Sequence, residues 1–317
     1  MQKYTIHDFN RDFPDEESCL DLVADLIYPD GMPCRKCGEL RKHHRLTNRK
    51  AFSCQICGTH IYPLAGTIFA KSTTPLKSWF YAMYLIASTR CGISAKQLER
   101  ELGVTYKTAW RIYNQLRKLM AENSGPLTGT VEVDETWIGG KPRYRAGGPQ
   151  PARRADGSRR PGRRTRAEAP NQKPVIGMVE RGGRVRAFAV PHVGRRVAQP
   201  LVQAHVMPAS LVYTDAANAY DLLEGKGYRH ERIHHEAKVY VDGDIHTNTI
   251  EGFWSLLKNG IAGVYHSVSA KHLQAYVNEY AFRYNHRKSD APMYELVKAQ
   301  VKAVRYGRYG AYAPIGE

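Results

Sequence analysis

Four cysteines near the N-terminus constrain the fold more than any other feature of this 317-residue chain. They form two Cys-x-x-Cys pairs, each followed by a glycine: Cys34, Cys37, Cys54 and Cys57. Such glycines permit tight turns in which the backbone approaches a thiolate. Four thiolates can complete the tetrahedral shell of one zinc ion, which is the structural kind of zinc site. The polar neighbours Arg35, Lys36 and Gln55 argue against a buried cysteine core, so we predict a zinc ribbon at residues 31–70.

Helical patterns lie on both sides of this ribbon. Residues 1–30 are predicted to be a leading helical segment, because apolar residues between Leu20 and Ile27 recur at helical spacing before the stop sequence PDG. Residues 71–120 are predicted to form a helix-turn-helix DNA-binding domain, with Ser94 as a helix N-cap and Gly103 in the turn.

The second helix of that motif is expected to run from about Thr105 to Leu119. In helix-turn-helix proteins this helix enters the major groove of DNA with its N-terminal residues leading. We therefore expect the following side chains to contact substrate DNA: Tyr106, Lys107, Thr108 and Arg111. A plain three-helix bundle with a solvated basic face is the alternative.

The second half of the chain changes to strand patterns after a linker at residues 121–129. Three consecutive strands, a helix and then alternating elements predict a mixed sheet flanked by helices over residues 130–290. The chain as a whole is thus predicted to be a multidomain protein of the α+β and α/β classes. Residues 291–317 are expected to be a C-terminal tail.

Residues 141–172 form a strongly basic insertion between the first two strands of this predicted domain. Between Lys141 and Arg166, ten lysine and arginine residues stand against one acid, Asp156. A stretch of this composition cannot bury a core, and we expect a loop that becomes ordered on a phosphate backbone. A solubilising insertion is the alternative.

The overall charge indicates a polyanionic partner. Lysine and arginine number 47 against 30 acidic residues, which gives a formal net charge of +17. Nucleic acid is the first candidate and an anionic membrane surface the second. The longest apolar run, Trp79 to Ala87, is about half the length that a transmembrane helix needs, so no membrane partner is expected. The first residues lack an apolar signal core, which favours a cytoplasmic location.

Three acids have placements that suggest a catalytic metal site. In HTNTIEGFWSLLKNG, one helical stripe is apolar, and Glu251 lies on a separate polar stripe with Asn248, Ser255 and Lys258. Asp134 follows the apolar strand TVEV, and Asp215 ends the apolar run LVYT. Carboxylates brought together by two strands and a helix repel one another unless cations join them. Two hard divalent ions would satisfy such a site and would support in-line displacement at phosphorus.

A series of motifs runs along nearly the whole chain: CxxC…CxxC, GTIF…PLKSWF, the helix-turn-helix, VDETWIGG, YTDAANAY, HTNTIEGFWSLLK and HSVSAKHLQAYVNEYAFRYN. This combination, from about residue 7 to 286, resembles the zinc-ribbon DDE transposases of bacterial insertion sequences, the ISXO-like class. The resemblance implies an RNase H-like catalytic domain whose acidic triad is Asp134, Asp215 and Glu251. Some members of the class carry asparagine in place of the last acid, and this chain keeps the acid.

The resemblance also implies a reaction and its partners. Metal-activated water would cleave double-stranded DNA at the element ends, and the freed 3′-hydroxyl would then attack target DNA. An oxygen-only triad favours magnesium or manganese, and zinc would be structural. The protein would act in the bacterial cytoplasm as a homo-oligomer on DNA, because two element ends must be joined together.

Individual roles are predicted for several residues near the triad. Lys258 is expected to meet a phosphate, and His246 and Asn248 to orient substrate or a ligand. For the latter pair, simple capping of the helix by Asn248 or Thr247 is the alternative. Strand alternation places Glu132 on the face of Asp134, which leaves a ligand role open for it, and Glu135 on the other face.

The sequence is also compatible with three alternatives to a transposase. One is a zinc-ribbon and helix-turn-helix DNA-binding regulator with an inactive RNase H-like domain. The acidity of all three triad positions argues against such decay. Another is a metal-dependent nuclease on the same fold, which would cut DNA without joining it. The third is a zinc-ribbon RNA-processing factor, which would leave the helix-turn-helix without a role.

Overall fold

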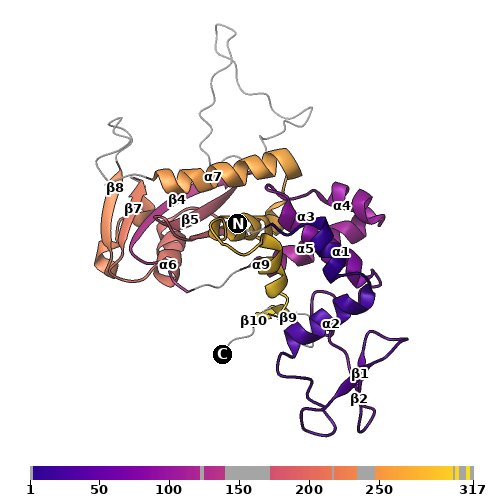
Figure 1. Ribbon diagram of the computed structural model, residues 1–317. Coiled ribbons are helices and arrows are strands. Elements are labelled where there is room, and N and C mark those ends of the chain that lie inside the picture. Colours follow the sequence, from indigo (N-terminus) through magenta and orange to yellow (C-terminus); the bar gives the residue numbers. More distant parts are fainter. Residues whose placement is uncertain are drawn as a thin grey trace. The chain divides into compact units, whose positions relative to one another are not determined.

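The computed structural model describes residues 3–121, 125–139, 172–215, 218–233, 247–302, 304–306 and 312–314. The chain divides into two compact units, one made of residues 1–122 and 286–317 and the other of residues 123–285 (Figure 1). Within the described ranges, no helix is both long and apolar enough to cross a membrane. The basic insertion lies almost wholly outside these ranges.

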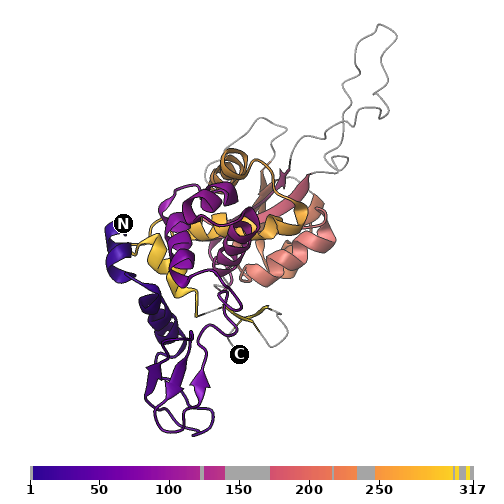
Figure 2. The same ribbon diagram turned by 90° about the vertical axis from the view of Figure 1, so that its right-hand side faces the viewer.

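The first unit begins with two helices and a small three-stranded ribbon (Figure 2). Helix α1 covers Ile6–Asp12 and α2 covers Glu16–Ile27. The antiparallel ribbon has the order β1-β2-β3 and the following bounds: β1 His43–Arg45, β2 Phe52–Cys54 and β3 His60–Ile61. The predicted leading helix corresponds to α2. Helix α1 was missed, although its N-terminus has a reciprocal capping box between Thr5 and Asp8.

Residues 71–120 of this unit, which were predicted to form a helix-turn-helix, contain three helices. Helix α3 covers Leu76–Ser88, α4 covers Ala95–Leu102 and α5 covers Tyr106–Leu119. Ser94 caps α4 through the amide of Gln97, and Gly103 ends α4 with a left-handed φ of 63°. That conformation favours glycine because it has no Cβ. The predicted cap and turn residue are therefore both confirmed.

The C-terminal residues differ from the expected tail. Helix α9 covers Met293–Ala299 and belongs to the first unit, as do β9 (Val304–Tyr306) and its antiparallel partner β10 (Tyr312–Pro314). Tyr294 is buried and stacks on Tyr4 with ring centroids 4.4 Å apart. Seven residues give too few helical turns for a clear periodic signal, and for this reason the sequence pattern failed to show α9.

The second unit is built on a five-stranded mixed sheet. Its strands are β4 Thr130–Ile138, β5 Lys173–Glu180, β6 Val185–Ala189, β7 Leu211–Asp215 and β8 Arg229–Ile233. The spatial order is β6-β5-β4-β7-β8, in which β5 is antiparallel to both its neighbours and β4, β7 and β8 are parallel. This confirms the mixed sheet that the sequence predicted. The last strand begins at Arg229, and residues 234–246, which follow it, lie outside the described ranges.

Helices cover both faces of this sheet (Figures 1 and 2). On one face, α6 (Arg195–His205) packs through Ala198 and Val202 against Val131 and Val133 of β4. On the other face lie α7 (Asn248–Gly260), a π-helical turn (Ile261–Tyr265) and α8 (Leu273–Asn285). The predicted apolar stripe of α7 is buried there in full: Ile250, Phe253, Trp254, Leu257 and Ile261. Its burial fixes the polar stripe of α7 on the outside.

Candidate functional site

An open groove of about 620 Å³ runs between strand β4 and helix α7. Its lining includes two of the three acids that the sequence singled out. The side chains that matter for its chemistry are Asp134, Trp137, Glu251, Trp254, Ser255 and Lys258. Residues that are far apart in sequence are thus brought together on one face of the sheet.

Asp134 is held in this groove by the indole of Trp254. Trp254 Nε1 donates a hydrogen bond of 2.8 Å to Asp134 Oδ2. Gly177 lies directly opposite Asp134 on β5, and a Cβ atom at Gly177 would fall 2.5 Å from the Trp254 ring. The absence of a side chain at Gly177 therefore provides the space in which the indole packs and reaches the carboxylate.

We expect Gly177→Ala to destabilise the protein, because its new methyl group would overlap the Trp254 ring. Forcing atoms into a packed core costs about 1–3 kcal/mol. Gly252→Ala is a matched control, since Gly252 is within α7 and a Cβ there meets nothing within 4 Å. Replacing a helical glycine with alanine should stabilise the fold by about 0.5–1 kcal/mol. Urea unfolding of both variants checks that the unfolding free energy falls in Gly177→Ala and rises in Gly252→Ala. Equal unfolding midpoints would contradict the close packing of Trp254 on Gly177.

Asp215 reaches the same region through the backbone register. Strand β7 runs parallel to β4, with Val133 opposite Thr214, so positions 134 and 215 follow next to each other on adjacent strands. Adjacent strands lie about 4.8 Å apart. The side chain of Asp215 lies outside the described part of the structure. Before it, Thr214 is fully buried, and its Oγ1 lies 2.9 Å from Nε2 of His230 on β8.

Glu251 lies in the first turn of α7 and is exposed. Among the described residues, its carboxylate has no hydrogen bond or ion-pair partner. An acid in the first turn is favoured by the helix dipole, which offsets part of the repulsion from a nearby carboxylate. Ser255 and Lys258 follow on the same side of α7, and Lys258 is exposed to the groove.

Glu132 does not face the groove as a metal ligand would, although strand alternation had left that role open. It is completely buried. Its carboxylate accepts hydrogen bonds from the amides of Thr249 and Ile250, at 2.9 and 3.0 Å, in the first turn of α7. The N-cap residue of that helix, Thr247, makes no side-chain cap bond. The alternative in which Asn248 or Thr247 caps the helix is therefore wrong, because a strand residue supplies the cap.

The remaining predicted residues near the groove have mixed outcomes. His246 lies outside the described ranges. Asn248 is exposed at the first residue of α7 and is not among the residues that line the groove. Glu135 accepts a hydrogen bond of 3.2 Å from the hydroxyl of Tyr220, which belongs to the core on the α6 face. This contact agrees with the opposite orientation expected from strand alternation.

The four cysteines of the ribbon come together as the spacing predicted. Their sulfur atoms all lie within 4.8 Å of one another, and those of Cys34 and Cys57 are 3.4 Å apart. Ligands on a tetrahedral zinc ion with Zn–S bonds of about 2.3 Å would be about 3.8 Å apart. Hydrogen bonding from the side chain and backbone of Thr59 lowers the pKa of Cys57 to about 6, whereas side-chain hydrogen bonding with Cys57 and Cys34 raises the pKa of Cys37 to about 12. The site is thus compatible with structural zinc.

The predicted DNA-contacting residues lie on the exposed N-terminal half of α5. Tyr106 is 47% exposed, and Lys107 and Arg111 are exposed beside it. Lys96 Nζ of α4 lies 5.5 Å from the centre of the Tyr106 ring. Arg111 donates a hydrogen bond of 3.4 Å to the carbonyl of Ala70. These contacts gather positive charge around the start of the second helix of the motif.

Comparison with known proteins gives consistent results for both halves of the chain. Residues 126–285 match the family described as ISXO2-like transposase domain, and residues 14–60 match the transposase zinc-ribbon domain. A protein in transposable element ISH50 of Halobacterium salinarum is 30% identical over 283 residues, which cover 86% of this chain and 91% of that protein. A transposase-like protein of Haemophilus influenzae is 28% identical over 38% of this chain and 94% of its own length.

Solved structures show only a distant likeness. The Mos1 transposase paired-end complex with left transposon end aligns over 70% of this chain and 79% of that chain. The sequence identity is 14% and the TM-score is 0.28.

Proposed function

The chain belongs to the family of ISXO2-like transposases, and we propose that it binds insertion-sequence ends and catalyses metal-dependent cleavage and strand transfer of DNA. One observation carries the catalytic part of this proposal. Asp134 and Glu251 line a single groove, and position 215 adjoins position 134 on the neighbouring strand. This arrangement supports a site in which two strands and a helix contribute the three acids.

We infer that Asp134, Asp215 and Glu251 hold magnesium or manganese. Carboxylate oxygens are the ligands that these hard ions prefer. The exposed carboxylate of Glu251, which has no partner among the described residues, fits a ligand position. When bound, such ions would activate the attacking oxygen and stabilise the leaving oxygen of an in-line displacement at phosphorus.

Other side chains of the groove would orient the acids and the DNA. The Trp254 indole holds the Asp134 carboxylate in one orientation through its 2.8 Å hydrogen bond. Lys258 presents a cation further along the same groove and would contact a phosphate of the bound strand. His246 and Asn248 retain the proposed role of orienting substrate near the start of α7.

We also propose that the N-terminal half recognises double-stranded DNA at the element ends. Tyr106, Lys107 and Arg111 would reach into the major groove or touch its phosphates, and the zinc ribbon would add contacts. The net charge of +17 supports a polyanionic substrate. Joining two ends to target DNA would require a homo-oligomer, and we place the reaction in the bacterial cytoplasm.

Divalent-ion dependence tests the proposed activity. We expect the protein to nick labelled DNA carrying the flanking inverted repeats in magnesium or manganese. Omission of magnesium and manganese should stop the nicking but leave end binding intact, because the structural zinc remains in the ribbon and neither the ribbon nor α5 needs the groove. Nicking that continues at the same rate without added magnesium or manganese would contradict a metal-dependent site. Binding without nicking under every condition would instead favour the regulator alternative.

A further inference from the structure

We propose that Glu132 is a positioning residue that fixes the first turn of α7, and with it Glu251, relative to the strand that carries Asp134. The inference rests on the proposed function, because it assigns Glu132 a role in forming the metal site. It adds a residue that would touch neither metal nor DNA. Glu132 would act only through the helix that it caps.

The contacts of Glu132 use both of its carboxylate oxygens. Oε2 accepts the amide hydrogens of Thr249, at 2.9 Å, and of Ile250, at 3.0 Å. Oε1 accepts the Thr249 hydroxyl and Arg181 Nε, each at 2.9 Å. Glu132 is 0% exposed, and a buried charge of this kind is tolerable only when it is fully paired.

The start of α7 needs such a partner. The first amides of a helix have no acceptor within the helix, and they are usually satisfied by the side chain of the N-cap residue. Here Thr247 provides no side-chain bond. A carboxylate from the neighbouring strand therefore satisfies two of these amides, and its negative charge is further stabilised by the helix dipole.

Two separate ties between β4 and α7 enclose Glu251. The first joins Glu132 to Thr249 and Ile250, which immediately precede Glu251. The second joins Asp134 to Trp254, nearly one turn after Glu251. Because both ties start from the same face of one strand, they fix the place of Glu251 along and around the helix. Loss of the first tie would leave Glu251 on a fraying helix end.

Arg181 supplies the positive charge that pairs with the Glu132 carboxylate. Its guanidinium lies 4.5 Å from the centre of the Tyr213 ring, and Tyr213 on β7 is the register partner of Glu132. The cation thus offsets the buried charge, and its stacking on Tyr213 links this anchor to the strand that ends in Asp215. The carboxylate therefore lies among the three elements that carry the acidic triad.

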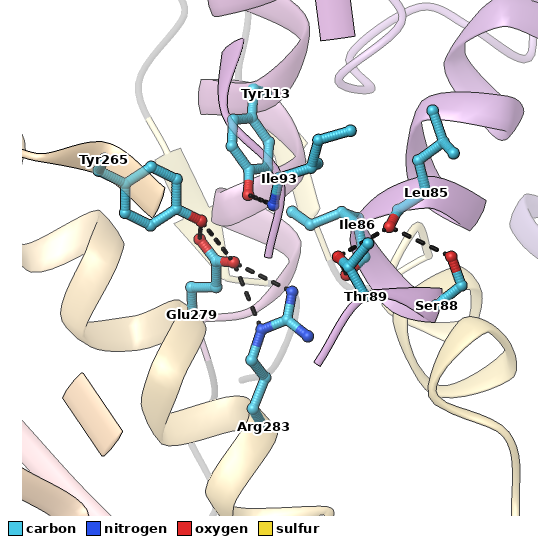
Figure 3. A network of polar contacts seen from close by, with 9 residues as sticks. All are labelled: Leu85, Ile86, Ser88, Thr89, Ile93, Tyr113, Tyr265, Glu279 and Arg283. Carbon is cyan, nitrogen blue, oxygen red and sulfur yellow. Dashed lines mark hydrogen bonds and ion pairs between the residues drawn. The ribbon is translucent and has the colours of Figure 1, made fainter. Parts of the chain in front are cut away.

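Glu132→Gln tests this role against a purely structural one. Glutamine keeps the size of the side chain but has a single acceptor oxygen, so it cannot accept all four hydrogen bonds. Glu279→Gln is the matched control. Glu279 is also 0% exposed and accepts bonds from the Tyr265 hydroxyl at 3.0 and 3.1 Å and from Arg283 at 3.1 Å (Figure 3). It lies on α8 and makes none of the cap bonds to the start of α7.

Three quantities would be measured on the full-length, zinc-loaded protein: the melting temperature, amide hydrogen exchange at the start of α7, and Mn²⁺ affinity by titration calorimetry. Both variants should melt at lower temperature. Only Glu132→Gln should lose exchange protection at residues 249–251 and raise the Mn²⁺ dissociation constant, by about 10-fold to 100-fold. Thr249→Val is a milder variant, because it removes one of the four hydrogen bonds and leaves the buried charge. Its exchange protection at residues 249–251 and its Mn²⁺ affinity should both lie between those of the wild type and Glu132→Gln.

The opposite pattern would overturn the inference. If Glu132→Gln lowers only the melting temperature, as Glu279→Gln does, then Glu132 is a structural residue. If Glu132→Gln does not fold, unchanged exchange and Mn²⁺ affinity in Thr249→Val would overturn the inference equally. A wild type that neither binds Mn²⁺ nor nicks DNA would contradict the proposed function, and hydrogen exchange alone would then decide whether Glu132 holds the helix start.

Discussion

Asp134→Asn is expected to abolish DNA nicking while leaving the fold and the binding of element ends intact. Asparagine has the shape of aspartate, and its side-chain oxygen can still accept the Trp254 hydrogen bond of 2.8 Å. It lacks the negative charge that a hard divalent ion requires. If about 4 kcal/mol of transition-state stabilisation is lost, the nicking rate falls by about 10³-fold. Single-turnover nicking of labelled end DNA in manganese measures this rate.

Glu224→Gln is the control for that experiment. Glu224 is an exposed acid of the same unit in the turn before β8. The backbone of this turn accepts a hydrogen bond from Ala209, which lies just before the first residue of β7. Asp215 is the last residue of β7, so Glu224 lies near the other end of that strand. The nicking rate of Glu224→Gln should equal that of the wild type. Nicking by Asp134→Asn at a rate close to the control would remove Asp134 from the catalytic site.

Cys34→Ser is expected to release the zinc and unfold the ribbon. The ribbon strands are only two or three residues long, so they cannot supply a stable core of their own. In small zinc domains the metal contributes about 10–16 kcal/mol of apparent binding energy, which is also folding energy. The variant should lose bound zinc and bind element ends more weakly. The second unit should keep its stability, because the ribbon belongs to the other unit.

Cys91→Ser provides the comparison, since Cys91 is an exposed cysteine outside the four-cysteine cluster. Zinc content by metal analysis and end binding by titration should match the wild type in this variant. Retention of one zinc ion per chain by Cys34→Ser would contradict the four-cysteine site.

Local sequence signals predicted those parts of the molecule that depend on neighbouring residues. The Cys-x-x-Cys spacing predicted the sulfur cluster, and Ser94 and Gly103 marked the boundaries of α4. The apolar stripe of α7 predicted which face is buried and therefore which face carries Glu251. Each of these features follows from a period or a cap that a short segment contains in itself.

Long-range contacts were not predictable in the same way. The cap of α7 comes from Glu132 on a strand that precedes the helix by more than a hundred residues. Strand alternation correctly placed Glu132 on the same face of the sheet as Asp134. No sequence pattern predicts which backbone amides its carboxylate binds. Gly177 within β5 was a detectable signal, because a glycine inside a strand often marks a close approach. That Trp254 makes this approach could only be seen in the structure.

Strand transfer by the wild type and by Glu251→Gln tests the central claim most directly. Both proteins would be incubated with labelled inverted-repeat DNA, a target plasmid and manganese. We predict that the wild type nicks the element ends and joins the freed ends to the target. The variant should bind the same DNA with equal affinity but do neither. Nicking and joining by Glu251→Gln at the wild-type rate would contradict the assignment of Glu251, and nicking by the wild type without joining would make the protein a nuclease.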